Sequence, residues 1–293
     1  MTIPDTAQRF LFENTDIRGE RVGLSSSLQA AFEPHAYPQA IRSLLGEIAA
    51  AAVLLSTTLK FQGTMSLQAR SNGPVSVLMV ECTDQRTFRA IARWKEEPAD
   101  NADLQALLPD GQLVITVDPV KGKRYQGIVP LEHPTLADCF AQYFQQSEQL
   151  PTSVWLASDG DNASGFLLQA LPATVEKDEK VREERWSHLT TLAHTLTDEE
   201  LLSVETETLL HRLFHEEDIR LFDAEPVSYR CTCSRERTAT ALQTVDRREL
   251  EDILAEQGEI NMDCQFCNTR YSFSADEVAD LLAPRQTSPR TLH

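Results

Sequence analysis

The chain has 293 residues, of which 45 are acidic and 27 are basic, giving a formal net charge of −18 at neutral pH. That length favours two domains over one. The excess of negative charge disfavours a nucleic-acid partner, because the phosphate backbone would be repelled.

The N-terminal residues indicate a chain that is not exported. Asp5, Arg9 and Glu13 interrupt the apolar residues of the first 14 positions, so the uninterrupted apolar core of a secretory signal is missing. An uncharged apolar stretch at residues 48–59 is well short of the roughly 20 residues that cross a bilayer. We therefore expect a cytoplasmic protein with no membrane partner. In that reducing compartment, six cysteines point to metal binding or redox chemistry.

The first 175 residues predict a mixed helix and sheet domain. Apolar residues recur at helical spacing over 37–60, behind Pro38 at the first turn. Near-alternating patterns then predict strands at 64–68, 75–80, 88–94, 112–117, 125–131, 152–157 and 165–171, with a helix over 135–149. The basic turn Lys121-Gly122-Lys123-Arg124 is interpreted as a solvated hairpin tip in preference to an anion site. Because helices and strands do not alternate strictly, the fold class is α+β.

A segment of different composition follows over residues 176–225, which we call the linker. Residues 176–185 are dense in charge, and Leu189, Leu192 and Leu196 form a sparse apolar stripe. Thr197 and Glu200 form a capping box for a further helix. Such a helical segment has little apolar surface of its own, so it should be stable only when it is docked on another part of the chain. An ordinary pair of surface helices is the alternative.

The last domain, residues 226–293, contains two close cysteine pairs, Cys231 with Cys233 and Cys264 with Cys267. Four thiolates in two pairs, separated by a helical insert, are typical of a tetrahedral zinc site. A complete shell leaves no position for water, so the zinc is expected to be structural. Asp246 should cap one short helix in this domain, and Ser274 with Glu277 should cap another.

The spacing of the first pair raises a second hypothesis. A single residue between Cys231 and Cys233 is unusual for a zinc ligand pair, and a disulfide between them would close a small, strained ring. Strained disulfides are the labile, regulatory ones. A domain of about 60 residues also has a marginal core, whereas a structural zinc supplies on the order of 10 kcal/mol of folding free energy. Oxidation of the thiolates would release the metal and unfold the domain.

Other residues offer weaker candidates. Cys82, in a predicted strand, and Cys139, on a predicted helix, are interpreted as packed core residues, with peroxide sensing left open. His211 and His215 stand four residues apart, but the zincin spacing is absent, so we interpret them as a solvated or packed pair. Arg18 and Gly19 are assigned to a turn or interface, without chemistry.

Several motifs together resemble the 33 kDa heat-shock chaperonin family, a group of redox-regulated bacterial holdases. In the C-terminal region the similar residues are Cys231-Thr-Cys233-Ser234 with Arg235 and Arg237, Cys264-Gln-Phe-Cys267, and Tyr271-Ser-Phe273. In the N-terminal region they are residues 16–20, Tyr37-Pro38, and residues 45–47, 124–129, 147–151 and 165–172. The resemblance covers nearly the whole chain.

The resemblance implies a function. It implies an ATP-independent chaperone, not an enzyme, that is inactive when reduced and loaded with one Zn²⁺ per chain through Cys231, Cys233, Cys264 and Cys267. Oxidation would form disulfides that join Cys231 with Cys233 and Cys264 with Cys267, release the zinc and unfold the linker. The active form would be a homodimer that holds unfolding client proteins during oxidative and heat stress.

Two other classes of protein were weighed. A zinc ribbon that binds nucleic acid or protein would require a basic face around the cysteines, and the arginines there are offset by acidic residues such as Glu236 and Asp263. A thiol oxidoreductase that uses Cys264 and Cys267 would require a thioredoxin-like setting, which the pattern does not show.

Overall fold

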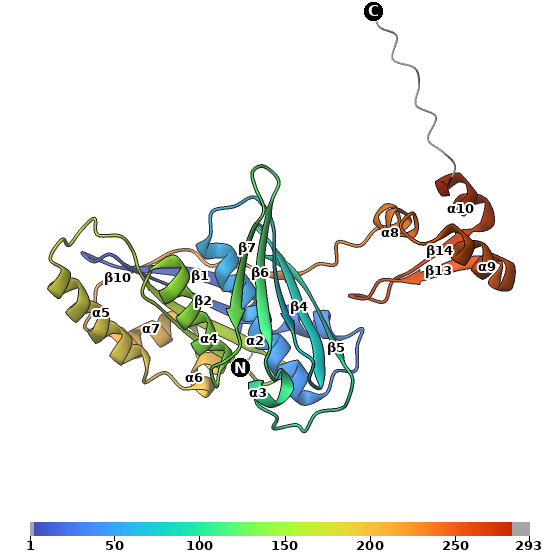
Figure 1. The fold of residues 1–293 in the computed structure, drawn as a ribbon. Coiled ribbons are helices and arrows are strands. Elements are labelled where there is room, and N and C mark those ends of the chain that lie inside the picture. The colour runs from blue at the N-terminus through green and yellow to red at the C-terminus, as the bar shows by residue number, and fades with distance from the viewer. Residues whose placement is uncertain (1–2, 283–293) are drawn as a thin grey trace, which may run out of the picture. The chain divides into compact units, whose positions relative to one another are not determined.

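The computed structural model describes residues 3–282 and divides into two compact units, Met1–Arg230 and Cys231–His293 (Figure 1). The linker belongs to the first unit in this conformation, and the four paired cysteines all lie in the second. The mixture of helices and mainly antiparallel sheets confirms the predicted α+β class.

The first sheet of the larger unit has the order β10-β1-β2-β9-β8, and β11 also pairs with β1. Its strands are β1 (Thr6–Phe12), β2 (Ile17–Leu24), β8 (Thr152–Ser158), β9 (Ala163–Ala170), β10 (Ile219–Leu221) and β11 (Glu225–Pro226). The two C-terminal strands predicted for the first domain, β8 and β9, are confirmed. The hairpin β1–β2 was not predicted.

The second sheet has the order β12-β5-β4-β3-β6-β7, in which β12 pairs with β5 in parallel and the other pairs are antiparallel. Its strands are β3 (Gly63–Arg70), β4 (Val75–Thr83), β5 (Thr87–Trp94), β6 (Gln112–Pro119), β7 (Tyr125–Pro130) and β12 (Ser228–Tyr229). The five predicted strands of this region are confirmed. Lys121, Lys123 and Arg124 are exposed between β6 and β7, as expected for a hairpin tip.

Helix α2 (Gln39–Thr58) is the centre of the main core. It contacts strands of both sheets, including β9, β8, β4 and β5. Pro38 is the N-cap residue and does not lie in the first turn as predicted. By length and composition α2 could cross a membrane, but 78% of its most apolar window is buried inside the unit, as in a core helix.

Shorter helices complete this unit. They are α1 (Ser26–Phe32), α3 (Leu104–Leu107), α4 (Leu136–Tyr143) and the π-helix η1 (Phe144–Glu148). The helix predicted over 135–149 therefore changes type after Tyr143, and it ends at Gln149, whose φ is 54°. Thr135 caps α4 by accepting a hydrogen bond from the Asp138 backbone N–H, 3.1 Å away.

The linker forms three helices, α5 (Glu179–Ala193), α6 (Asp198–Ser203) and α7 (Thr206–Phe214). The predicted capping box of Thr197 and Glu200 is present at the start of α6. Apolar linker side chains pack against apolar residues of the first sheet. The buried members of this cluster are Phe10, Phe12, Ile17, Ala157, Phe166 and Leu168 from the sheet, with Leu189, Ala193, Leu201, Leu209, Leu210, Leu213 and Phe214 from the linker. The linker is thus docked, and its helices share one apolar cluster with the sheet.

The second unit contains α8 (Arg235–Leu242), α9 (Arg247–Gln257), the hairpin β13 (Glu259–Asp263) and β14 (Arg270–Ser274), and α10 (Ala275–Leu282). Both predicted caps are present: Asp246 accepts from the Arg248 N–H at 2.9 Å, and Ser274 and Glu277 cap α10 reciprocally. The hairpin was not predicted. Among the residues that the structure describes, the buried core of the second unit consists of five hydrophobic side chains, Leu242, Leu250, Ile260, Phe273 and Val278.

Candidate zinc and redox site

Cys264 and Cys267 lie in the turn that joins β13 to β14. The strands pair antiparallel down to Asp263 and Arg270, whose side chains form an ion pair at 2.7 Å across the base of the turn. Within the turn, the Asn268 N–H donates to the Cys264 carbonyl at 2.8 Å. Asn268 adopts a left-handed conformation with φ 53°, which asparagine tolerates better than most residues. The tight turn brings the Cys264 and Cys267 thiols close together.

Cys231 and Cys233 lie on the segment that leads into α8. Ser234 is the N-cap of α8 and accepts a hydrogen bond from the Arg237 N–H. The Arg237 guanidinium turns back and donates to both the carbonyl and the hydroxyl oxygen of Thr232, each at 2.9 Å. Thr232 is the residue between the two cysteines, so the start of the helix fixes the path of the C-x-C segment.

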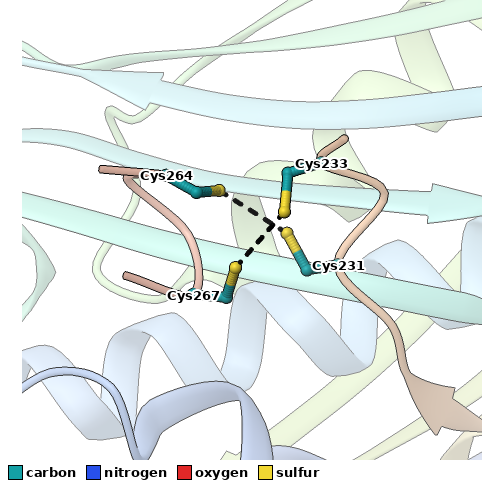
Figure 2. Close-up of side chains that lie close together, drawn as sticks. All are labelled: Cys231, Cys233, Cys264 and Cys267. Carbon is teal, nitrogen blue, oxygen red and sulfur yellow. Dashed lines mark hydrogen bonds between the residues drawn. The ribbon is translucent and has the colours of Figure 1, made fainter. Parts of the chain in front are cut away.

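The four sulfur atoms converge from these two segments, as Figure 2 shows. All lie within 4.8 Å of one another, with 3.7 Å between Cys231 and Cys264 and 3.4 Å between Cys233 and Cys267. A tetrahedron of thiolates around zinc, with bonds of about 2.3 Å, has sulfurs roughly 3.8 Å apart. The donor set and its spacing therefore fit a closed tetrathiolate zinc site. Among the described residues, this is the one such group of potential ligands.

Polar neighbours of the sulfurs affect their ionisation. The Tyr271 hydroxyl donates to Cys233 Sγ at 3.1 Å, and the Thr269 hydroxyl lies 3.2 Å from Cys267 Sγ. Burial opposes ionisation of Cys267, but its hydrogen bonds with the side chain and backbone of Thr269 and with the Cys233 and Cys231 thiols outweigh this effect and lower the pKa of Cys267 to about 7. Burial raises the pKa of Cys233, against the effect of Tyr271. All four thiols are only half-buried, so small molecules can reach them.

The residues that hydrogen-bond to the cysteines, or to Thr232 between them, were not all identified from the sequence. Arg237 and Tyr271 belonged to the motifs that carried the resemblance, without a stated role, and Thr269 was missed. A threonine two residues after a cysteine has no distinctive pattern, and its role depends on the hairpin turn.

The structure also locates the weaker candidates. Cys82 and Cys139 are buried in the main core, which confirms the packing interpretation, and burial raises the pKa of both thiols. His211 and His215 are both exposed, with ring centroids 6.4 Å apart.

The turn predicted for Arg18 and Gly19 is wrong, because both residues lie within β2, and the interface that was the alternative stays a prediction. Arg18 donates to Gln169 at 2.6 Å and to the Thr58 carbonyl at 3.3 Å. Gly19 lies under the Phe10 ring, where a Cβ would approach a ring carbon to 2.0 Å. Both residues therefore hold the first sheet together.

Comparison with known proteins gives a consistent answer. A family model described as Hsp33 protein matches residues 5–274. The 33 kDa chaperonin of Ectopseudomonas mendocina is 53% identical over 281 residues, which is 95% of each chain. That of Pseudomonas aeruginosa strain LESB58 is 53% identical over 285 residues, or 97% of this chain and 96% of the relative.

The fold agrees with a solved structure as well. The crystal structure of the 33 kDa chaperonin, a heat shock protein 33 homolog, of Thermotoga maritima aligns with a TM-score of 0.80 and 26% identity. The alignment covers 95% of this chain and 98% of that one. The chain therefore belongs to the Hsp33 family of chaperones.

Proposed function

We propose that this protein is a redox-regulated, ATP-independent holdase, which binds unfolding proteins after oxidation of its four paired cysteines. The observation that carries the proposal is the combination of a half-buried tetrathiolate site with a unit whose core has only five buried hydrophobic side chains. A zinc ion held by Cys231, Cys233, Cys264 and Cys267 would supply the folding free energy that this small core lacks.

Oxidation removes the ligands. Two thiolates lose two electrons as their S–S bond forms, and one molecule of hydrogen peroxide takes up these electrons and two protons, so that its O–O bond breaks and two molecules of water form. Two such events consume all four thiolates. A disulfide sulfur is a poor zinc ligand, because the metal binds thiolates. The second unit then loses its main source of stability and unfolds.

The pairing of the cysteines is proposed from the family resemblance: Cys231 with Cys233, and Cys264 with Cys267. The sulfur contacts at 3.4 and 3.7 Å run across these pairs, so proximity alone does not select them. Trypsin discriminates between the pairings, since its specificity places Cys231 and Cys233 together in residues 231–235, and Cys264 and Cys267 in residues 249–270. Neighbour pairing gives two separate peptides, each lighter by two hydrogens. A disulfide-linked conjugate of the two peptides would contradict the pairing.

Unfolding of the second unit is proposed to free the linker from the first sheet. The linker continues through β10, β11 and β12 directly into Cys231. When the second unit unfolds, these short strands are therefore the first part of the neighbouring chain that can unpair. Release would expose the apolar side chains of both partners, including Phe214 and Phe12. That surface suits non-native proteins, which also expose apolar side chains. We further propose that the active form is a homodimer and acts in the cytoplasm during oxidative and heat stress.

The charges around the site favour this function over a nucleic-acid-binding zinc ribbon. Arg235 pairs with Glu277 at 2.6 Å, and Arg270 pairs with Asp263 at 2.7 Å. Arg247 pairs with Glu251 at 2.8 Å. Arginines that are neutralised in this way are poorly placed to contact phosphates.

The decisive experiment compares two states of the full chain. Reduced, zinc-loaded protein and peroxide-treated protein are each mixed with a heat-labile client enzyme, and its aggregation is followed by light scattering while zinc per chain is measured. We expect protection only from the oxidised, zinc-free form. A Cys82→Ser/Cys139→Ser variant should behave like the parent. Equal protection by both states, or full zinc retention in the active state, would refute the proposal.

A further inference from the structure

One charged side chain lies buried beneath the docked linker. Arg21 of β2 is 4% exposed, and among the described residues its Nε has no hydrogen-bond partner. Its two terminal nitrogens both point to the linker. Nη2 donates to the Leu201 carbonyl at 2.9 Å, and Nη1 donates to the Thr206 hydroxyl at 3.3 Å.

These two acceptors bracket the junction between α6 and α7. Leu201 is in the last turn of α6, where carbonyl groups lack partners inside the helix, and Thr206 is the first residue of α7. The cluster between linker and sheet is otherwise made of apolar side chains, whose attraction is not directional. Arg21 therefore supplies an orientation that apolar packing alone does not.

The docked linker also shields Arg21 from water, which has a cost that the two hydrogen bonds must outweigh. Burial disfavours the charged guanidinium and lowers the pKa of Arg21 to about 10, and the charge of Glu205 only partly offsets this. Taking a charged group out of water costs several kcal/mol unless its hydrogen bonds are fully satisfied. When the linker leaves the sheet, the guanidinium of Arg21 becomes hydrated again.

We propose that Arg21 is the latch of the linker: a positioning residue whose two directional bonds hold the α6–α7 junction on the first sheet and outweigh the cost of its burial. Any effect of this latch on activation rests on the proposed holdase function. The latch itself is tested in reduced, zinc-loaded protein without oxidant or client. The test can therefore refute the latch while the holdase function stands, and the holdase function can fail while the latch stands.

The test is amide hydrogen exchange of the full chain, followed by mass spectrometry over residues 198–214. Arg21→Met keeps the approximate size of the side chain but leaves the Leu201 carbonyl without its donor. We expect exchange over 198–214 to accelerate roughly 10- to 100-fold, the effect of one unsatisfied buried group. Strands β3 to β6 should exchange as in the parent. Unchanged or slower exchange over 198–214 would overturn the proposal.

Control variants separate the latch from a change of charge or a loss of fold. Arg124→Met removes the same charge from an exposed hairpin tip and should leave the exchange over 198–214 unchanged; acceleration there equal to that of Arg21→Met would count against the latch. Arg21→Lys, which keeps one donor, should give an intermediate rate, and a rate equal to that of Arg21→Met would contradict the directional role.

Thr206→Val provides a test that leaves the sheet intact, in case Arg21→Met unfolds the whole unit. We expect a smaller acceleration than for Arg21→Met, because only the longer of the two bonds is lost. The double variant Arg21→Met/Thr206→Val should accelerate exchange by less than the product of the single effects, since both substitutions remove the same bond. Parent-like exchange in Thr206→Val, or effects that multiply fully, would show that the bond between Arg21 and Thr206 does not hold the linker.

Discussion

Phe214 offers the sharpest test of the idea that linker docking represses activity. Its side chain is 2% exposed and meets the Phe12 ring edge-to-face, with centroids 5.0 Å apart. Because Phe12 belongs to β1 and Phe214 to α7, this contact joins the sheet to the linker. The substitution Phe214→Ala removes a large buried side chain at the contact between the first sheet and the linker.

The size of the effect follows from the burial. Truncation of a buried phenylalanine to alanine costs about 3–5 kcal/mol. Each 1.4 kcal/mol changes an equilibrium constant tenfold, so the open fraction of the linker should rise by about two to three and a half powers of ten. We therefore expect reduced, zinc-loaded Phe214→Ala to suppress client aggregation without oxidant.

The assay is limited trypsin digestion of the reduced protein, which reports cleavage at Arg182, Arg185 and Arg212 within the linker, run beside the aggregation measurement. Phe222→Ala is the matched control, because the Phe222 side chain is 40% exposed. Linker cleavage in Phe214→Ala that is no faster than in Phe222→Ala, with the sheets still folded, would refute the reasoning.

Three further predictions concern the zinc site and the core. Chelation of zinc from the reduced protein should unfold residues 235–282 and leave strands β1 to β9 folded, because the second unit has a small core; protection from hydrogen exchange that survives over residues 235–282 would contradict this. Thr269→Val should lower zinc affinity about 10- to 100-fold by removing a hydrogen bond to Cys267, whereas Thr240→Val, on the exposed face of α8, should not; competition with a chromogenic chelator measures both. Burial, with the nearby charge of Asp198, raises the pKa of Glu47 from 4.5 to about 8. The folded state therefore binds the extra proton between these values, and the melting temperature of the first unit should fall as pH rises through that window; Glu47→Gln should flatten the dependence, and an unchanged slope would show that Glu47 is not its source.

Local chemistry made much of the structure predictable. The capping boxes at Thr197 and Ser274 depend on side chains three residues apart, so the sequence displays them directly. The strands of the second sheet show near-alternation, and α2 shows helical spacing. The four cysteines of the candidate zinc site were identifiable because close pairs of cysteines are typical of metal sites.

Strand β2 escaped prediction for a physical reason. Seven of its eight residues are buried, including Glu20 and Arg21, because one side of the sheet faces α2 and the linker covers the other. A strand that is covered on both faces does not alternate between apolar and polar residues. Its glycines also weaken the strand signal, although Gly19 is required for the close approach of Phe10.

The sequence by itself predicted the α+β class and identified the four cysteines whose sulfurs converge, because both depend on residue type and short spacing. Only the tertiary structure decided where the linker docks, that the four sulfurs converge at one site, and that Arg21 lies under the α6–α7 junction. These features join residues as far apart in the sequence as Phe12 and Phe214, and such contacts arise only when the sheets and helices assemble.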